Sequence, residues 1–177
     1  PYSMGGDALN GSGDDFVSWT FRKAPGFFDV VTYTGNGVQG RTISHNLGST
    51  PGLIIVKRTD SSRYWAVYHR SLGATKYLRL NEINAESTSN QIWSNTEPTS
   101  SVFTVHDDAT VNASGGTYVA YLFAHDDQSF GTNGDEAIIK CDSYTGASAH
   151  GTPLEVDVGF EPQFVLIKDT NSTRDWI

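Results

Sequence analysis

The sequence repeats itself at a constant offset. Most of the stretch from residue 28 to residue 70 returns near the C-terminus, and matched residues lie 111 positions apart (144 − 33, for example). The matched pairs include Tyr33/Tyr144, Gly35/Gly146, Gly40/Gly151, Gly48/Gly159, Pro51/Pro162, Lys57/Lys168, Arg63/Arg174 and Trp65/Trp176. Chance does not hold such an alignment without a gap from Tyr33 to Trp65. The chain is therefore an array of related units.

The period sets the domain organisation. It is too long for a solenoid repeat of about 20–50 residues and fits a whole domain of about 100–150 residues. A second internal similarity relates FVSWTFR at 16–22 to YVAYLFA at 118–124, with an offset of 102 (118 − 16). We therefore predict the end of a preceding unit and a linker in 1–26, with a polar loop over 1–15. A complete unit follows in 27–126, and a linker with the start of a second, truncated unit in 127–177.

Alternating apolar and polar residues, separated by Gly, Asn and Pro turns, predict an all-β fold. The near-continuous apolar run at 53–58 predicts a central strand buried on both faces. In the closing strand, Val119, Tyr121 and Phe123 are expected to face the core. The expected architecture is an antiparallel β-sandwich of the jelly-roll or lectin-like kind, in tandem. Strands are predicted at 16–22, 28–34, 41–47, 53–58, 64–69, 77–80, 91–93, 102–105, 118–124 and 137–145.

Charge and cysteine content exclude several kinds of partner. The formal net charge of −8 argues against a nucleic-acid backbone, which requires basic patches. Cys141, the single cysteine, excludes an intrachain disulfide and a cysteine-based zinc site. No apolar run reaches the length of a membrane span, so membrane insertion is not expected. No cofactor or metal site is predicted, because the histidines show no ligand spacing.

Catalytic motifs find no support in the sequence. No G-x-S-x-G nucleophile elbow is present. Carboxylates for glycoside hydrolysis could come from Asp107, Asp108, Asp126 or Asp127. These four residues lie in predicted turns, where Asp is expected for its local hydrogen bonds. We therefore predict that the chain is not an enzyme.

Residues retained in both copies are expected to serve the fold. Trp65 and Trp176 are interpreted as core residues rather than platforms for sugar rings, and Lys57 and Lys168 as side chains that extend to solvent or pair with a carboxylate. Residues without a counterpart are the better candidates for binding. The candidates for contact with a glycan or another subunit are Trp93, Tyr77, Arg79 and His69. For Trp93, burial on a short strand is the favoured alternative.

Three segments, at 19–37, 51–70 and 111–124, resemble the repeated domain of tail-fibre-like proteins of marine bacteriophages, including those of cyanobacteria. The second copy keeps the family's G-F-x-P pattern at Gly159–Pro162, whereas the first has Gly48-Ser49-Thr50-Pro51. The resemblance carries no catalytic motif. It implies concanavalin-like β-sandwich units strung along a homotrimeric virion appendage that contacts other tail proteins.

The function that this resemblance implies is that of a bacteriophage structural protein located in the virion. It would be a tail fibre or related appendage that positions or performs host attachment. Two alternatives stay open at this stage. One is a lectin-like module that binds a host surface glycan, and the other is a capsid or tail decoration protein.

Overall fold

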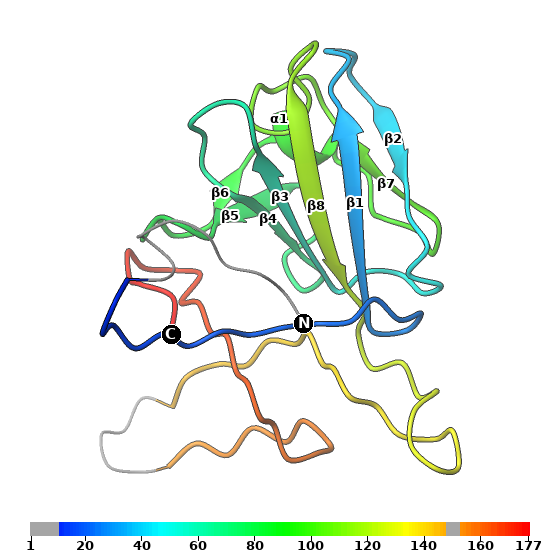
Figure 1. Ribbon diagram of the computed structural model, residues 1–177, viewed down its shortest axis with the longest axis vertical. Helices are drawn as coiled ribbons and strands as arrows, with labels where there is room; N and C mark the ends of the chain where they lie inside the picture. Colours follow the sequence, from blue (N-terminus) through cyan, green and yellow to red (C-terminus); the bar gives the residue numbers. More distant parts are fainter. Residues whose placement is uncertain (1–10, 148–152) are drawn as a thin grey trace.

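The computed structural model describes residues 11–147 and 153–177. Within them, eight strands and one helical turn lie between Phe28 and Phe123, in two antiparallel sheets (Figure 1). The predicted all-β antiparallel sandwich is confirmed. Most of the predicted loop 1–15, as well as Gly151, lies outside the described residues.

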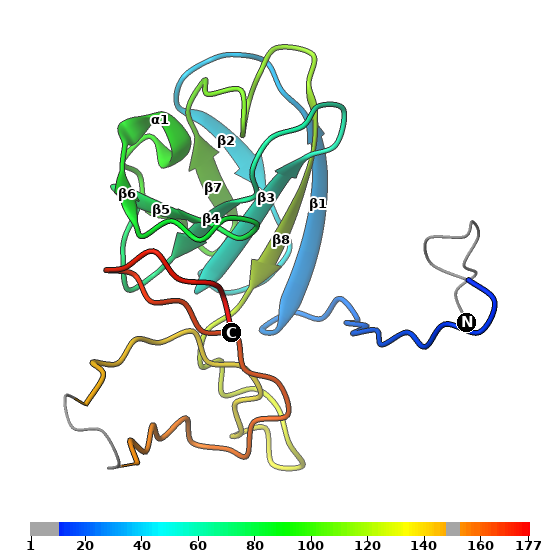
Figure 2. The same ribbon diagram turned by 90° about the vertical axis from the view of Figure 1, so that its left-hand side faces the viewer.

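The two sheets are unequal in size. The larger has the order β1-β8-β3-β4-β5-β6, and the smaller pairs β2 with β7. Figure 2 shows the small sheet and the helical turn α1 on one side of the large sheet. The bounds are β1 (Phe28–Thr34), β2 (Arg41–Ser44), β3 (Leu53–Arg58), β4 (Ala66–His69), β5 (Lys76–Arg79), β6 (Ser87–Thr88), α1 (Asn90–Trp93), β7 (Val102–Val105) and β8 (Thr117–Phe123).

The main core lies between the two sheets. Along β3, Ile54 and Val56 belong to this core while Ile55 faces the opposite side, as the two-residue period of a strand requires. All three are buried, so the predicted burial of β3 on both faces is confirmed. The core also contains Ile43, Leu47, Ala66, Tyr68, Tyr77, Trp93, Phe103, Val105, Tyr118, Ala120 and Leu122.

The core face predicted for the closing strand is wrong. Tyr118, Ala120 and Leu122 face the main core, whereas Tyr121 and Phe123 lie on the outer face, the side of the large sheet turned away from β2 and β7. Both faces of β8 are apolar, so its alternation could not decide between them. The outer face is formed by Leu53, Ile55, Trp65, Leu72, Val67, Leu78, Leu80, Tyr121 and Phe123.

The segment around Trp93 is a helical turn and not the predicted strand. Ser89 caps it, since its hydroxyl accepts a hydrogen bond from the Gln91 N–H at 3.1 Å, and Ser94 ends it with a left-handed φ of 53°. Ile92 and Trp93 are both buried. Successive residues of a strand point to opposite faces, so the helical turn allows both neighbours to enter one core.

The prediction of a strand at 16–22 is also wrong. This segment has no strand structure, and Val17 and Trp19 are 84% and 67% exposed. Its counterpart β8 is central, paired with β1 on one side and β3 on the other. Within the described residues, no strand takes those two places beside 16–22, so the segment is not part of a sheet. Phe21 instead packs against Phe28 and Phe123, with ring centroids 5.6 and 5.9 Å apart.

The strand predicted at 137–145 is absent from the structure as well. Its counterpart β1 pairs with β8, whereas no described strand pairs with 137–145. Ile139 packs against the main core instead, and its carbonyl accepts the Asp126 N–H at 2.9 Å. Cys141 is buried beside His125, whose Nδ1 accepts the Cys141 N–H at 3.1 Å. The start of the second copy therefore extends along the first unit.

The second copy does reproduce one hairpin of the first. In the first unit Val56 pairs with Ala66 across β3 and β4. The residues 111 positions later, Ile167 and Ile177, exchange both backbone hydrogen bonds, at 2.7 and 3.0 Å. The repeat seen in the sequence is therefore also a repeat of backbone pairing.

The lysine of this hairpin has the same role in both copies. Lys57 Nζ donates to the Arg63 carbonyl at 2.8 Å, and Lys168 Nζ donates to the Arg174 carbonyl at 2.7 Å. Each ammonium thus closes its own loop through a backbone carbonyl. Neither lysine forms an ion pair with a carboxylate among the described residues, so that part of the prediction is not borne out.

Gly35, retained as Gly146, is required by a close backbone contact. A Cβ at Gly35 would lie 2.0 Å from the Ala113 carbonyl oxygen. The Gly35 N–H and carbonyl also bond to Gly116 and Gly115, which fixes this approach. We expect Gly35→Ala to lower the free energy of unfolding by about 1–3 kcal/mol, measured by urea denaturation. Gly146→Ala is the matched control, because a Cβ at Gly146 would meet no other atom. Gly40→Ala is unsuitable, because the φ of +74° at Gly40 would strain an alanine there. Equal losses at Gly35 and Gly146 would contradict the argument.

Candidate functional site

Trp93 is placed in the core, where a sugar ring cannot reach it. Its side chain is 2% exposed and packs edge-on against Tyr68, with ring centroids 6.1 Å apart. The indole N–H is buried without a hydrogen-bond partner within the described residues. A stacking platform must offer an open ring face, so the proposed glycan contact is corrected to the favoured alternative, burial.

Tyr77 and Arg79 lie together on β5. Arg79 donates to the Tyr77 hydroxyl at 3.2 Å and to Glu82 at 2.7 Å, and its guanidinium lies 4.5 Å from the centre of the Tyr64 ring. Burial alone would raise the pKa of Tyr77, but the hydrogen bond from Arg79 lowers that pKa below its ordinary value. Burial raises the pKa of Tyr64 to about 12. Tyr77 is buried, so Arg79 is the more accessible of the pair.

His69 lies apart from those residues, at the end of β4. Its Nδ1 accepts the Ser71 N–H at 3.2 Å. Burial, together with the charge of Arg70, lowers the pKa of His69. The structure thus brings Tyr77 and Arg79 together, and it does not gather all four predicted residues into one site.

The carboxylates considered for catalysis satisfy local donors. Asp108 accepts the Thr110 N–H at 2.7 Å, and Asp107 bonds to its neighbour His106. Asp126 accepts from Gln128 at 3.2 Å, and Asp127 accepts from the Ser129 hydroxyl. Each bond spans one to two residues, which is the turn chemistry expected for Asp.

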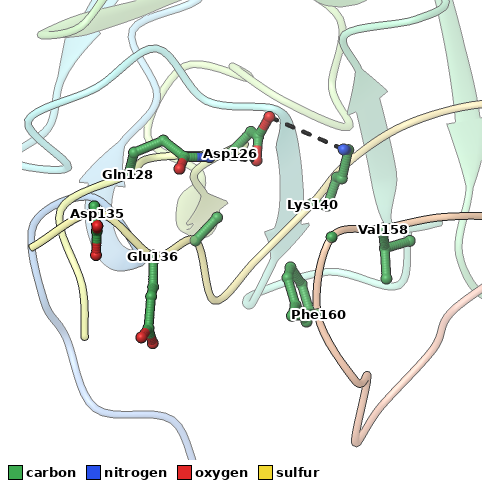
Figure 3. Close-up of a pocket in the computed structure, with 9 residues that line it drawn as sticks. Asp126, Gln128, Asp135, Glu136, Lys140, Val158 and Phe160 are labelled. Carbon is green, nitrogen blue, oxygen red and sulfur yellow. Dashed lines mark hydrogen bonds and ion pairs between the residues drawn. The ribbon is translucent and has the colours of Figure 1, made fainter. Parts of the chain in front are cut away.

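A polar depression of about 470 Å³ lies between the 126–140 segment and residues 158–160. Figure 3 shows the Asp126, Asp135 and Glu136 carboxylates pointing in different directions, with Lys140 directed toward Asp126 at 4.0 Å. Neither a paired acid and base nor a nucleophile with an adjacent base is formed there. Within the described residues no group of three or more His, Cys, Asp or Glu side chains could hold a metal ion. Over the same residues, no helix has the length and apolar character needed to cross a bilayer.

The second copy lies against the first on the side of β5 and the chain that follows it. Trp176 joins the outer-face cluster, and its indole N–H donates to the Arg79 carbonyl at 2.9 Å. Lys168 Nζ donates to the Ile83 carbonyl at 3.2 Å. The Glu86 N–H donates to the Thr170 carbonyl at 2.9 Å. The C-terminal residues, red in Figure 1, lie below this side of the sandwich.

Sequence reasoning pointed to this surface only in part. It singled out Arg79, whose carbonyl receives Trp176, but it interpreted Trp176 as a residue of its own unit's core. The constant offset was the available signal, because it places Trp176 in the same hairpin position as Trp65. Nothing in the sequence indicates that the second hairpin packs on the first unit.

Acid is expected to destabilise the fold through buried histidine. Burial lowers the pKa of His45, His69 and His125. In His45, Nε2 donates to the Thr99 carbonyl at 3.2 Å and Nδ1 accepts the Leu47 N–H at 3.3 Å, so the neutral ring is the bonded form. A lowered folded pKa means that stability is complete above the unfolded value of about 6.5 and is lost as the pH falls below it.

Asp29 adds a second loss at lower pH. Burial alone would raise its pKa, but the hydrogen bonds from Lys23, the Asn46 N–H and the Val30 N–H lower it overall. The stabilisation by Asp29 is therefore present above about pH 4 and is lost below it.

The loss caused by the histidines can be measured by urea denaturation. The free energy of unfolding should be lower at about pH 5 than at about pH 7.5, and His45→Gln should reduce that difference. Equal stability at the two pH values would contradict this account.

The fold and its contacts define a class: a protein with an antiparallel β-sandwich, on which a C-terminal segment that repeats part of the same sequence packs. The chain belongs to the family described as a domain of unknown function (DUF7483), which it matches over residues 2–177. That span includes both copies of the repeat. No curated protein and no solved structure matched the chain.

Proposed function

We propose that the chain is part of a bacteriophage virion structural protein, a tail fibre or a related appendage. Its β-sandwich units would act as a spacer that positions the host-attachment machinery. The observation that carries the proposal is the repeated hairpin, in which Ile167 and Ile177 pair as Val56 and Ala66 do. A chain that repeats one unit and packs successive copies together extends its length without requiring a new fold.

Three further features support this proposal. The net charge of −8 favours a soluble surface with little self-adhesion. The four aspartates considered for catalysis bond to neighbouring residues in turns rather than converging on a reacting group. The resemblance to phage tail-fibre repeats adds the expectation of a homotrimer in contact with other tail proteins.

The lectin-like alternative is less well supported by the geometry. Trp93 and Tyr77 are buried, and Arg79 and His69 lie on different strands. A glycan site generally combines an open aromatic face with nearby polar groups, and these four residues do not provide that arrangement.

Immunolabelling of virions tests the proposal. Antibodies raised against the purified chain should decorate a tail appendage of the bacteriophage that encodes it, as seen by electron microscopy. Antibodies against a non-structural protein of the same phage provide the matched control. Labelling confined to infected-cell lysate, with bare virions, would overturn the proposal. Decoration of the capsid would replace the appendage with a capsid decoration protein.

A further inference from the structure

The polar contacts that the second hairpin, residues 167–177, makes with the first unit use groups that the first hairpin also carries. Two side chains and one carbonyl of this hairpin bond to the first unit: the Lys168 ammonium, the Trp176 indole and the Thr170 carbonyl. The residues 111 positions earlier are Lys57, Trp65 and Thr59, identical in type at all three places. The first copy therefore carries the same set of contact groups on the same hairpin.

At one position that differs between the two hairpins, each residue bonds to its own loop. Asp169, which stands where the first copy has Arg58, accepts the Asn171 and Ser172 N–H groups at 2.9 and 3.1 Å. Arg58 pairs with Asp60 of its own loop at 2.7 Å. This difference leaves the groups that face another unit unchanged.

The contact groups of the first hairpin are open to a partner. Residues 59–63 are all exposed. Trp65 is half-buried, and its indole N–H has no hydrogen-bond partner in the described part of the chain, whereas that of Trp176 bonds to the Arg79 carbonyl. An aromatic N–H beside apolar surface gains when it finds an acceptor in a contact.

We infer that the hairpin loop 57–65 docks onto a second unit of the same kind, at the surface equivalent to residues 79–86. The expected contacts are those already formed by 168–176: indole to the carbonyl at position 79, ammonium to the carbonyl at 83, and the N–H at 86 to the loop carbonyl. One loop and one receiving surface per unit make a heterologous contact, which generates an extended array. The inference does not depend on the virion assignment, since it concerns only how units join.

A variant of the full chain tests this inference. Lys168→Met combined with Trp176→Ala removes two of the three contacts that occupy the receiving surface. The surface then becomes available to loop 57–65 of another copy. Light scattering on a sizing column should show an average mass that rises with concentration to about twice that of the unchanged chain or more, because each docking step adds a whole chain.

A third substitution distinguishes specific docking from nonspecific association through exposed apolar side chains. Lys57→Met, added to the double variant, should return the mass to that of the unchanged chain. An increase that persists without Lys57 would come from exposed outer-face residues and would overturn the inference. A folded double variant with unchanged mass would overturn it too. If circular dichroism shows the double variant unfolded, Trp176→Phe, which removes only the indole N–H, should show the same rise at higher concentration, and its absence there decides against docking.

Discussion

Replacing Trp93 with alanine is expected to lower the free energy of unfolding by about 3–5 kcal/mol, the range for deleting a buried aromatic side chain. The ring is fully enclosed by the main core and packs against Tyr68. It is also the second of two adjacent buried residues in α1, whose Ile92 carbonyl accepts the His106 N–H at 3.0 Å. The cavity would therefore lie where α1 attaches to the end of β7.

Two matched variants check this prediction by urea denaturation. Trp19→Ala removes the same side chain from a position that is 67% exposed and should change stability by less than about 0.5 kcal/mol. Trp93→Phe keeps most of the volume and removes a buried N–H that has no partner within the described residues, so its loss should be much smaller. A Trp93→Ala loss as small as that of Trp19→Ala would contradict the core placement.

Asn112→Ala is expected to cost about 2–4 kcal/mol, because several buried hydrogen bonds are lost at once. The Asn112 side chain is completely buried. Its Oδ1 accepts from the Asn36 N–H at 3.0 Å and from Arg41 at 3.2 Å. Its Nδ2 donates to Asn36 Oδ1 at 3.1 Å and to the Val38 carbonyl at 2.9 Å. One amide thus holds the turn between β1 and β2 against the segment that precedes β8.

Thermal and urea denaturation of three variants would measure this effect. Asn112→Asp keeps the shape but replaces the donor with an acceptor, which would face the Val38 carbonyl, so it should also be destabilising. Asn84→Ala, at an exposed position, is the control and should change stability by less than about 0.5 kcal/mol. Near-normal stability of Asn112→Ala would mean that water replaces the amide, and the network would then not hold the turn.

Much of the fold was predictable because strand periodicity is a local property. The run LIIVKR at 53–58 coincides with β3, and the predicted burial of that strand on both faces is confirmed. The face of β8 was not predictable in the same way. Both of its faces carry apolar and aromatic side chains, and only pairing with β1 and β3 decides which one meets the small sheet.

The candidate site depended on information that a single sequence carries weakly. Tryptophan is a residue type common in binding sites, but the turn capped by Ser89 directs Trp93 into the core. Segments 16–22 and 137–145 have strand-like sequences, yet a strand forms only when a neighbouring strand pairs with it, and neither segment joins a sheet in the described structure. The offset of 111 was the strongest sequence signal, and it led to the hairpin contact at Arg79 only once Trp176 could be placed in space.

The solution mass of the intact, unchanged chain tests the proposed function most directly. Light scattering on a sizing column measures it without reference to shape. The resemblance to phage tail-fibre repeats leads us to expect the mass of about three chains, that of a closed homotrimer. A mass of one chain at all concentrations would contradict the trimeric appendage.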